Sequence, residues 1–94
     1  MSSHVVYVDV DDTLVRSVGS KRIPIPSAID RVRALHESGA VLYLWSTSGA
    51  DYAKAAATEL GLAELFTAFL PKPTIIIDDQ EVHEWRDTTH ERPF

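Results

Sequence analysis

The chain has no cysteine, and its 9 basic residues are outnumbered by 14 acidic ones, which gives a net charge of −5 at pH 7. Without cysteine it forms no disulfide and offers no thiolate to a metal, which suits a reducing compartment. The shortage of Lys and Arg argues against nucleic-acid binding, because phosphates are held mainly by positive side chains. No apolar run approaches the roughly 18 residues of a membrane span, and no secretory signal is recognisable. We therefore predict a cytoplasmic protein that does not enter a membrane.

The length of the chain limits its organisation. With 94 residues, of which 45% are hydrophobic and 24% charged, it has the composition of one globular domain. A chain of this size hides only roughly 60 to 65% of its unfolded surface, so its core is small. We predict a single domain over residues 1–94 with at most one active site.

Three uninterrupted apolar runs are rich in β-branched and aromatic residues, and each ends at a polar residue. They are Val5 to Val8, Val41 to Trp45 and Thr74 to Ile77. Runs that do not alternate with polar residues are typical of parallel strands covered on both faces. A fourth and weaker candidate strand covers residues 66–70.

Two helices are predicted between these strands. The first begins near Pro26, with Ser27 as the capping residue and Asp30 three positions later; the second has Ser48 and Asp51 in the same arrangement. Strands that alternate with helices form right-handed crossovers. The expected fold is therefore an α/β three-layer sandwich, with a Rossmann-like parallel sheet and ligands at the carboxyl ends of the strands.

Acidic residues follow the first and the last apolar run. Asp9 and Asp11 end the first run, and Asp78 and Asp79 end the last one. If these strands are neighbours, at least three carboxylates meet at one edge of the sheet, where their repulsion favours a bound cation. Carboxylate oxygens that leave room for water and phosphate suit Mg²⁺. The sequence therefore predicts a magnesium site.

These residues, together with Ser46 and Lys72, carry a resemblance to a known family. The chain resembles phosphohydrolases of the haloacid dehalogenase superfamily, and the resemblance extends over residues 5–79. Its four motifs correspond, in order, to Asp9-Val10-Asp11-Asp12-Thr13-Leu14, Leu42 to Ser46, Pro71-Lys72-Pro73 and Ile77-Asp78-Asp79. The resemblance implies a minimal core without a cap domain, because neither gap between the motifs is long enough to hold one.

The resemblance also implies a reaction. Asp9 is the expected nucleophile, which forms an aspartyl-phosphate, and Asp11 is the expected general acid and base. The implied ligands of Mg²⁺ are Asp9, the backbone carbonyl of Asp11, and Asp79, with Asp78 either bound directly or placed behind the other ligands. The predicted activity is a Mg²⁺-dependent hydrolysis of phosphomonoesters.

Three further residues are implied to bind phosphate. Ser46 and Lys72 are expected to hold phosphoryl oxygens, and Thr47 is the alternative hydroxyl beside Ser46. The substrate is a phosphorylated small molecule or macromolecule. The turn-rich, basic segment 16–25 is predicted to be a flap over the strand ends, while the role of residues 80–94 is open.

Two other functions remain open. A receiver-like signalling domain also combines acidic residues, a hydroxyl, a lysine and Mg²⁺. In a receiver the acidic pair follows the first strand and the hydroxyl and lysine come later, whereas in this chain the second acidic cluster, Asp78 and Asp79, comes after Ser46 and Lys72. Alternatively, the short core is a non-catalytic module that binds phosphate or metal. It could also act only with a partner subunit or a second copy, because a sheet this small leaves an edge strand that another chain can cover.

Overall fold

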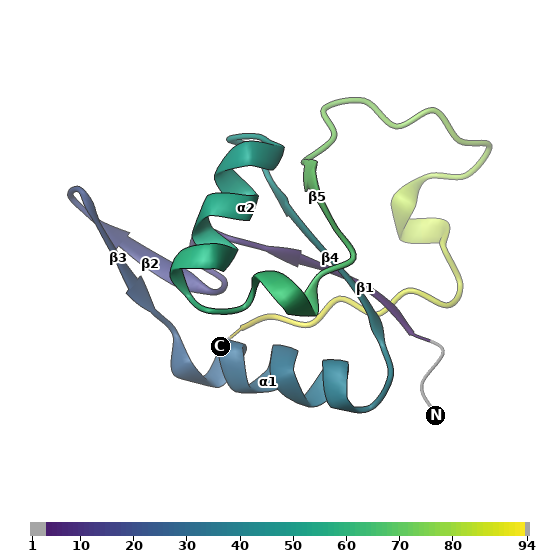
Figure 1. The fold of residues 1–94 in the computed structure, drawn as a ribbon. Helices are drawn as coiled ribbons and strands as arrows, with labels where there is room; N and C mark the ends of the chain where they lie inside the picture. Colours follow the sequence, from purple (N-terminus) through teal and green to yellow (C-terminus); the bar gives the residue numbers. More distant parts are fainter. Residues whose placement is uncertain (1–3, 94) are drawn as a thin grey trace.

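A parallel sheet of three strands forms the centre of the computed structural model, which describes residues 4–93 (Figure 1). The strands are β1 (Val5–Asp9), β4 (Val41–Ser46) and β5 (Ala68–Pro71), in the order β1-β4-β5. The first two predicted strands are thereby confirmed, and the third place in the sheet belongs to the weaker candidate at 66–70.

The predicted strand from Thr74 to Ile77 is wrong. These residues form no strand, and the side chains of Ile75 and Ile77 are 79% and 97% exposed. Only Lys72 and Pro73 separate them from β5. Because a parallel strand needs a crossover of a dozen or more residues, a run that starts this soon after β5 has no room to return to the sheet as a parallel strand.

Two helices cover one face of the sheet. They are α1 (Pro26–Glu37), between β1 and β4, and α2 (Ala50–Glu59), between β4 and β5. Both crossovers step in the same direction across the sheet, so their right-handed connections place both helices on the same side. One core cluster accordingly contains residues from both helices and from the strands, among them Ala28, Val32, Leu42, Leu44, Ala53 and Ala57.

The opposite face of the sheet is largely open. Leu42 and Leu44 are fully buried, whereas Val5, Tyr7 and Val41, which lie at the alternate positions of their strands, are 62%, 48% and 40% exposed. This alternation is that of a sheet packed on one side only. The small α/β fold class is confirmed, but the strands are not covered on both faces, and the three-layer Rossmann-like arrangement is not confirmed.

Neither helix begins with the predicted side-chain cap. The residue before α1 is Ile25 and that before α2 is Gly49, and neither makes a side-chain capping hydrogen bond. Pro26 occupies the first turn of α1, where its fixed φ suits the helix and its missing N–H needs no partner. Gly49, at φ 105°, lies in a region that non-glycine residues rarely adopt.

The segment predicted as a flap forms an antiparallel hairpin. Its strands are β2 (Val15–Val18) and β3 (Lys21–Pro24), joined by Gly19 and Ser20. Gly19 adopts φ 60°, as a tight hairpin turn requires. The hairpin leads from the end of β1 directly into α1, so it starts at the carboxyl edge of the sheet.

Short 3₁₀ helices complete the described chain: η1 (Ala63–Leu65) precedes β5, and η2 (Val82–Glu84) lies in the C-terminal tail. The tail returns along the molecule and ends beside α1 (Figure 1). There Glu91 accepts two hydrogen bonds from the Arg31 guanidinium, at 2.8 and 2.9 Å. Within residues 4–93, no helix has the length and apolar character needed to cross a membrane.

Candidate functional site

The carboxyl ends of the three parallel strands bring polar side chains from separate segments together. Asp9 ends β1, Ser46 ends β4, and Lys72 directly follows β5. The register pairs Asp9 with Trp45 and Ser46 with Pro71, so the three residues share one edge of the sheet. The Nζ atom of Lys72 lies 4.0 Å from Oδ1 of Asp9. This neighbourhood of a carboxylate and an ammonium group is the centre of the candidate site.

A tight turn after β1 positions the side chain of Thr13 beside Asp9. The carbonyl oxygen of Val10 accepts hydrogen bonds from the backbone N–H groups of residues 13, 14 and 15, at 2.9 to 3.3 Å. Asp12 adopts φ 59° in this turn, a left-handed conformation that aspartate tolerates better than most residues. The turn folds Thr13 back on β1, so that its Oγ1 donates to Oδ2 of Asp9 at 3.4 Å.

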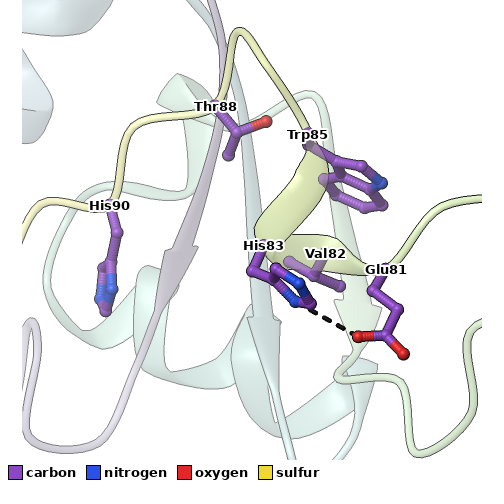
Figure 2. A pocket seen from close by; sticks show the side chains of 6 residues that line it. All are labelled: Glu81, Val82, His83, Trp85, Thr88 and His90. Carbon is purple, nitrogen blue, oxygen red and sulfur yellow. Dashed lines mark ion pairs between the residues drawn. The ribbon is translucent and has the colours of Figure 1, made fainter.

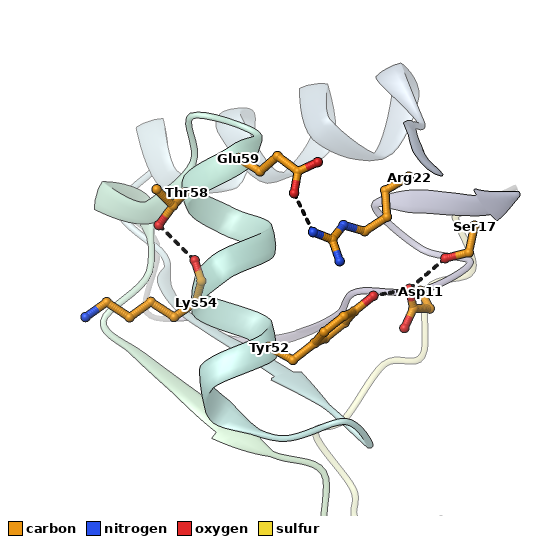
Figure 3. A network of polar contacts seen from close by, with 7 residues as sticks. All are labelled: Asp11, Ser17, Arg22, Tyr52, Lys54, Thr58 and Glu59. Carbon is orange, nitrogen blue, oxygen red and sulfur yellow. Dashed lines mark hydrogen bonds and ion pairs between the residues drawn. The ribbon is translucent and has the colours of Figure 1, made fainter. Parts of the chain in front are cut away.

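The Asp11 carboxyl connects the turn to two other elements. Its Oδ1 atom accepts hydrogen bonds from the Tyr52 hydroxyl of α2, at 2.8 Å, and from the Ser17 hydroxyl of β2, at 3.0 Å. Figure 3 shows the Tyr52 ring extending from α2 toward Asp11, with Ser17 on the other side. Asp11 therefore holds the hairpin and α2 together at the edge of the sheet.

Arg22 of β3 closes this network over the Tyr52 ring (Figure 3). Its guanidinium carbon lies 5.1 Å from the ring centroid, and its Nη2 forms an ion pair with Glu59 of α2. Burial raises the pKa of Tyr52, and the hydrogen bond to Asp11 raises it further. The Tyr52 hydroxyl is consequently protonated at neutral pH and acts as a donor to Asp11.

The two candidate hydroxyls after β4 differ in their surroundings. Ser46 is only 2% exposed, and its Oγ accepts the backbone N–H of Ser48 at 3.0 Å. Thr47 is exposed. The Ser46 oxygen thus organises the turn that leads into α2, while Thr47 is the more accessible of the two.

Asp78 and Asp79 lie outside this cluster. Both are exposed and belong to the segment that leaves β5 and runs away from the helices (Figure 1). Oδ1 of Asp78 accepts the backbone N–H of Gln80 at 2.9 Å, and this hydrogen bond is the main cause that lowers the pKa of Asp78. Their expected approach to Asp9 depended on a strand at 74–77, which the chain does not form.

The arrangement does not supply the expected set of metal ligands. Among residues 4–93, no group of three or more His, Cys, Asp or Glu side chains lies close enough to hold a metal ion. Asp9 and Asp11 are the predicted ligands that lie at the carboxyl edge. The Asp11 carboxyl is engaged by the Tyr52 and Ser17 hydroxyls, and Asp11 was expected to bind through its backbone carbonyl, so Asp9 offers the one side-chain carboxylate of the predicted set at this edge. The predicted three-carboxylate site for Mg²⁺ therefore does not fit the residues as they are arranged.

A shallow pocket lies elsewhere, on the C-terminal tail. Figure 2 shows its side chains, with an ion pair between His83 and Glu81 at 3.3 Å. It is lined by Glu81, Val82, His83, Trp85, Thr88 and His90. None of these residues is among the candidates at the strand ends, so the pocket is separate from the proposed chemistry.

Tyr52 and Ser17 were not among the site residues predicted from the sequence. Tyr52 is in the first turn of a helix that starts just after β4, and Ser17 is in the segment that follows the acidic motif. Both positions are therefore close to the carboxyl edge of the sheet. Polar residues in the first turn after a strand are the signal that identifies such positions.

The comparisons with known proteins identify the family and correct one expectation. The model of a family described as "Protein of unknown function (DUF705)" matches residues 1–91. A protein of Autographa californica nuclear polyhedrosis virus, "Uncharacterized 38.0 kDa protein in P143-LEF5 intergenic region", is 29% identical over 77 residues, which cover 82% of this chain and 24% of the viral protein. The chain thus spans about a quarter of the length of this relative.

No solved structure matches the chain. The family that matches is not the haloacid dehalogenase superfamily, so the identification made from the four motifs is wrong. Short acidic and hydroxyl motifs at strand ends arise wherever parallel strands deliver polar residues to one edge, and they do not define a family by themselves. Because its family model covers nearly the whole sequence, the chain belongs to the DUF705 family of proteins of unknown function.

Proposed function

We propose that the protein hydrolyses phosphomonoesters through a covalent phosphate on Asp9. The observation that carries the proposal is the Asp9 carboxylate beside the Lys72 ammonium, 4.0 Å apart at the carboxyl edge of a parallel sheet. Their side chains are 31% and 40% exposed, so a substrate can reach both. A carboxylate nucleophile next to a cation suits phosphoryl transfer, because the cation offsets the repulsion between the carboxylate and the phosphate.

The neighbouring residues support a two-step reaction. A carboxylate oxygen of Asp9 attacks phosphorus, the bond from phosphorus to the leaving oxygen breaks, and the Asp11 carboxyl gives that oxygen a proton. Water then attacks the aspartyl-phosphate and loses a proton to Asp11, which restores the Asp9 carboxylate and releases inorganic phosphate. Lys72 would hold phosphoryl oxygens throughout, and the exposed Thr47, which directly follows β4, is the candidate for a second phosphate contact.

Dependence on Mg²⁺ stays a prediction, and no step is assigned to the ion. Within residues 4–93 no three acidic or histidine side chains are placed to hold one ion together, so the edge offers a sparse ligand set for a divalent cation. Comparing phosphate release in Mg²⁺ with release in a chelator tests the prediction independently of the roles of Asp9 and Lys72.

The test is release of phosphate from p-nitrophenyl phosphate and from a panel of alkyl phosphates. We expect wild-type protein to release phosphate and Asp9→Asn to lower kcat by about a hundredfold or more, because the amide is not a nucleophile. Asp12→Asn is the matched control. Asp12 is exposed, and asparagine tolerates the same left-handed backbone conformation, so this variant is expected to retain wild-type activity.

Equal activity of wild type and Asp9→Asn would contradict the proposal. The same assay over a range of protein concentrations examines whether a second copy completes the site and covers the open face of the sheet as a third layer. In that case specific activity rises with concentration, together with the molecular mass measured by light scattering.

A further inference from the structure

We propose that Tyr52 is the residue that positions Asp11, and that the resulting geometry assigns the catalytic proton to Oδ2 of Asp11. The inference rests on the proposed phosphatase function and deepens it. It starts from two hydroxyl groups, those of Tyr52 and Ser17, that converge on the same carboxylate oxygen from different elements, at 2.8 and 3.0 Å.

The hydrogen bonds decide which oxygen of Asp11 is free to carry a proton. A carboxylate oxygen has two lone pairs, and both lone pairs of Oδ1 are used when it accepts from Tyr52 and Ser17. A proton on Oδ1 would displace one of these donors. The proton that passes to the leaving oxygen is therefore carried by Oδ2, the other oxygen of the same group.

Tyr52 is the better fixed of the two donors. Its side chain is half-buried and starts from the first turn of α2, a helix that packs on β4 and β5. Arg22 lies over its ring and is itself paired with Glu59 on the same helix. Ser17, in contrast, is exposed on the hairpin. A rigid support of this kind holds a catalytic carboxyl more accurately than a loop residue does.

The chemistry predicts a dependence on the leaving group. An alkyl alcohol is a poor leaving group and needs the proton from Asp11, whereas p-nitrophenolate leaves readily without it. A misplaced Asp11 therefore slows hydrolysis of alkyl phosphates more than hydrolysis of p-nitrophenyl phosphate. A general loss of folded protein would lower both rates by the same factor.

The experiment compares Tyr52→Phe with wild type on an alkyl phosphate and on p-nitrophenyl phosphate. We expect kcat for the alkyl phosphate to fall by about tenfold, with KM changed by less than about twofold, and the aryl phosphate to lose much less. Tyr43→Phe is the matched control. Its hydroxyl makes no hydrogen bond within residues 4–93, and Tyr43 lies on the open face of the sheet, so both rates are expected to stay at wild-type values.

Each of the following outcomes overturns an assignment. Equal loss on both substrates, or no loss, contradicts the role of Tyr52 while the phosphatase function stands. A wild-type protein that hydrolyses neither substrate contradicts the proposed function and this inference with it. Should Tyr52→Phe unfold, as judged by circular dichroism, Ser17→Ala provides the same comparison through the other donor, and an equal effect on both substrates then contradicts the positioning of Asp11.

Discussion

At the scale of single residues, the carboxyl edge of the sheet is organised by side chains that accept hydrogen bonds from the backbone or from hydroxyls. Ser46 is the most buried of them, and its Oγ is the acceptor for the N–H of Ser48 in the turn before α2. Asp11 plays the corresponding part for Tyr52 and Ser17. Such residues shape the site whether or not they contact a substrate.

Replacing Ser46 by alanine is expected to lower the free energy of unfolding by about 1 kcal/mol, because the part-buried N–H of Ser48 loses its acceptor. Urea denaturation followed by circular dichroism measures the change. Ser27→Ala is the control: Ser27 is exposed and makes no capping hydrogen bond, so its change is expected to be within about 0.5 kcal/mol. Equal losses in the two variants would show that the Ser46 hydroxyl does not support the turn.

At the scale of elements, the packing of α2 against the sheet sets the position of Tyr52. The helix buries three alanines, at positions 53, 56 and 57, against the core. Small side chains allow a helix to approach a sheet closely, which keeps the first turn of α2 near Asp11. The hairpin β2-β3 is held to the same helix by Arg22 and Glu59. The site is therefore assembled from elements that depend on α2.

Enlarging a buried residue of α2 is expected to separate the helix from the sheet. Ala57 is fully buried, so Ala57→Leu is expected to destabilise the protein by about 1 to 3 kcal/mol through overpacking. Ala55→Leu places the same side chain on the exposed side of the helix and is expected to change stability by less than about 0.5 kcal/mol. Thermal unfolding compares the variants, and similar midpoints for both would contradict this packing.

At the scale of the whole molecule, the tail connects residues far apart in the sequence. Glu91 forms a two-pronged hydrogen bond with Arg31 of α1, and this contact is the main cause that lowers the pKa of Glu91. Both side chains are more than half exposed, so water screens the pair and its contribution is small. Because the pKa of Glu91 is lowered in the folded protein, the contact is at full strength at pH 7. It is lost as Glu91 becomes protonated, which happens when the pH falls below the ordinary glutamate pKa of about 4.3.

Removing the charge of Glu91 is expected to loosen the tail without unfolding the domain. In Glu91→Gln, amide hydrogen exchange of residues 88–92 at pH 7 is expected to rise by about two- to fivefold, because the ion pair with Arg31 is lost. Glu64→Gln, at an exposed position of η1, removes the same charge elsewhere and is expected to leave tail exchange unchanged. If wild type keeps its protection factors in the tail at pH 3, the ion pair does not hold the tail.

Local patterns predict much of this fold and part of the site. The runs at β1 and β4 and both helices follow from apolar patterning, and the placement of Asp9 and Ser46 at one edge follows from parallel strands. Lys72 was expected to precede a strand at 74–77, and it reaches the same edge because it directly follows β5. The run Thr74 to Ile77 has an equally strong strand pattern, but it lies too close to β5 to join the parallel sheet. The apolar pattern shows that a segment prefers the extended conformation. Whether the segment joins the parallel sheet also depends on the length of the chain that connects it to the preceding strand.

Local patterns along the chain suffice to predict the α/β class, the strand that ends at Asp9 just before Asp11, and the basic, turn-rich segment that becomes the hairpin. The arrangement in space was needed to show that one face of the sheet stays open, that Asp78 and Asp79 form no metal-binding group with Asp9 within residues 4–93, and that Tyr52 meets Asp11 from a helix 41 positions along the chain. The physical reason is that hydrophobic periodicity and local hydrogen bonding act over a few residues. Contacts between distant segments depend instead on crossover direction, connection length and close packing, which no single segment contains.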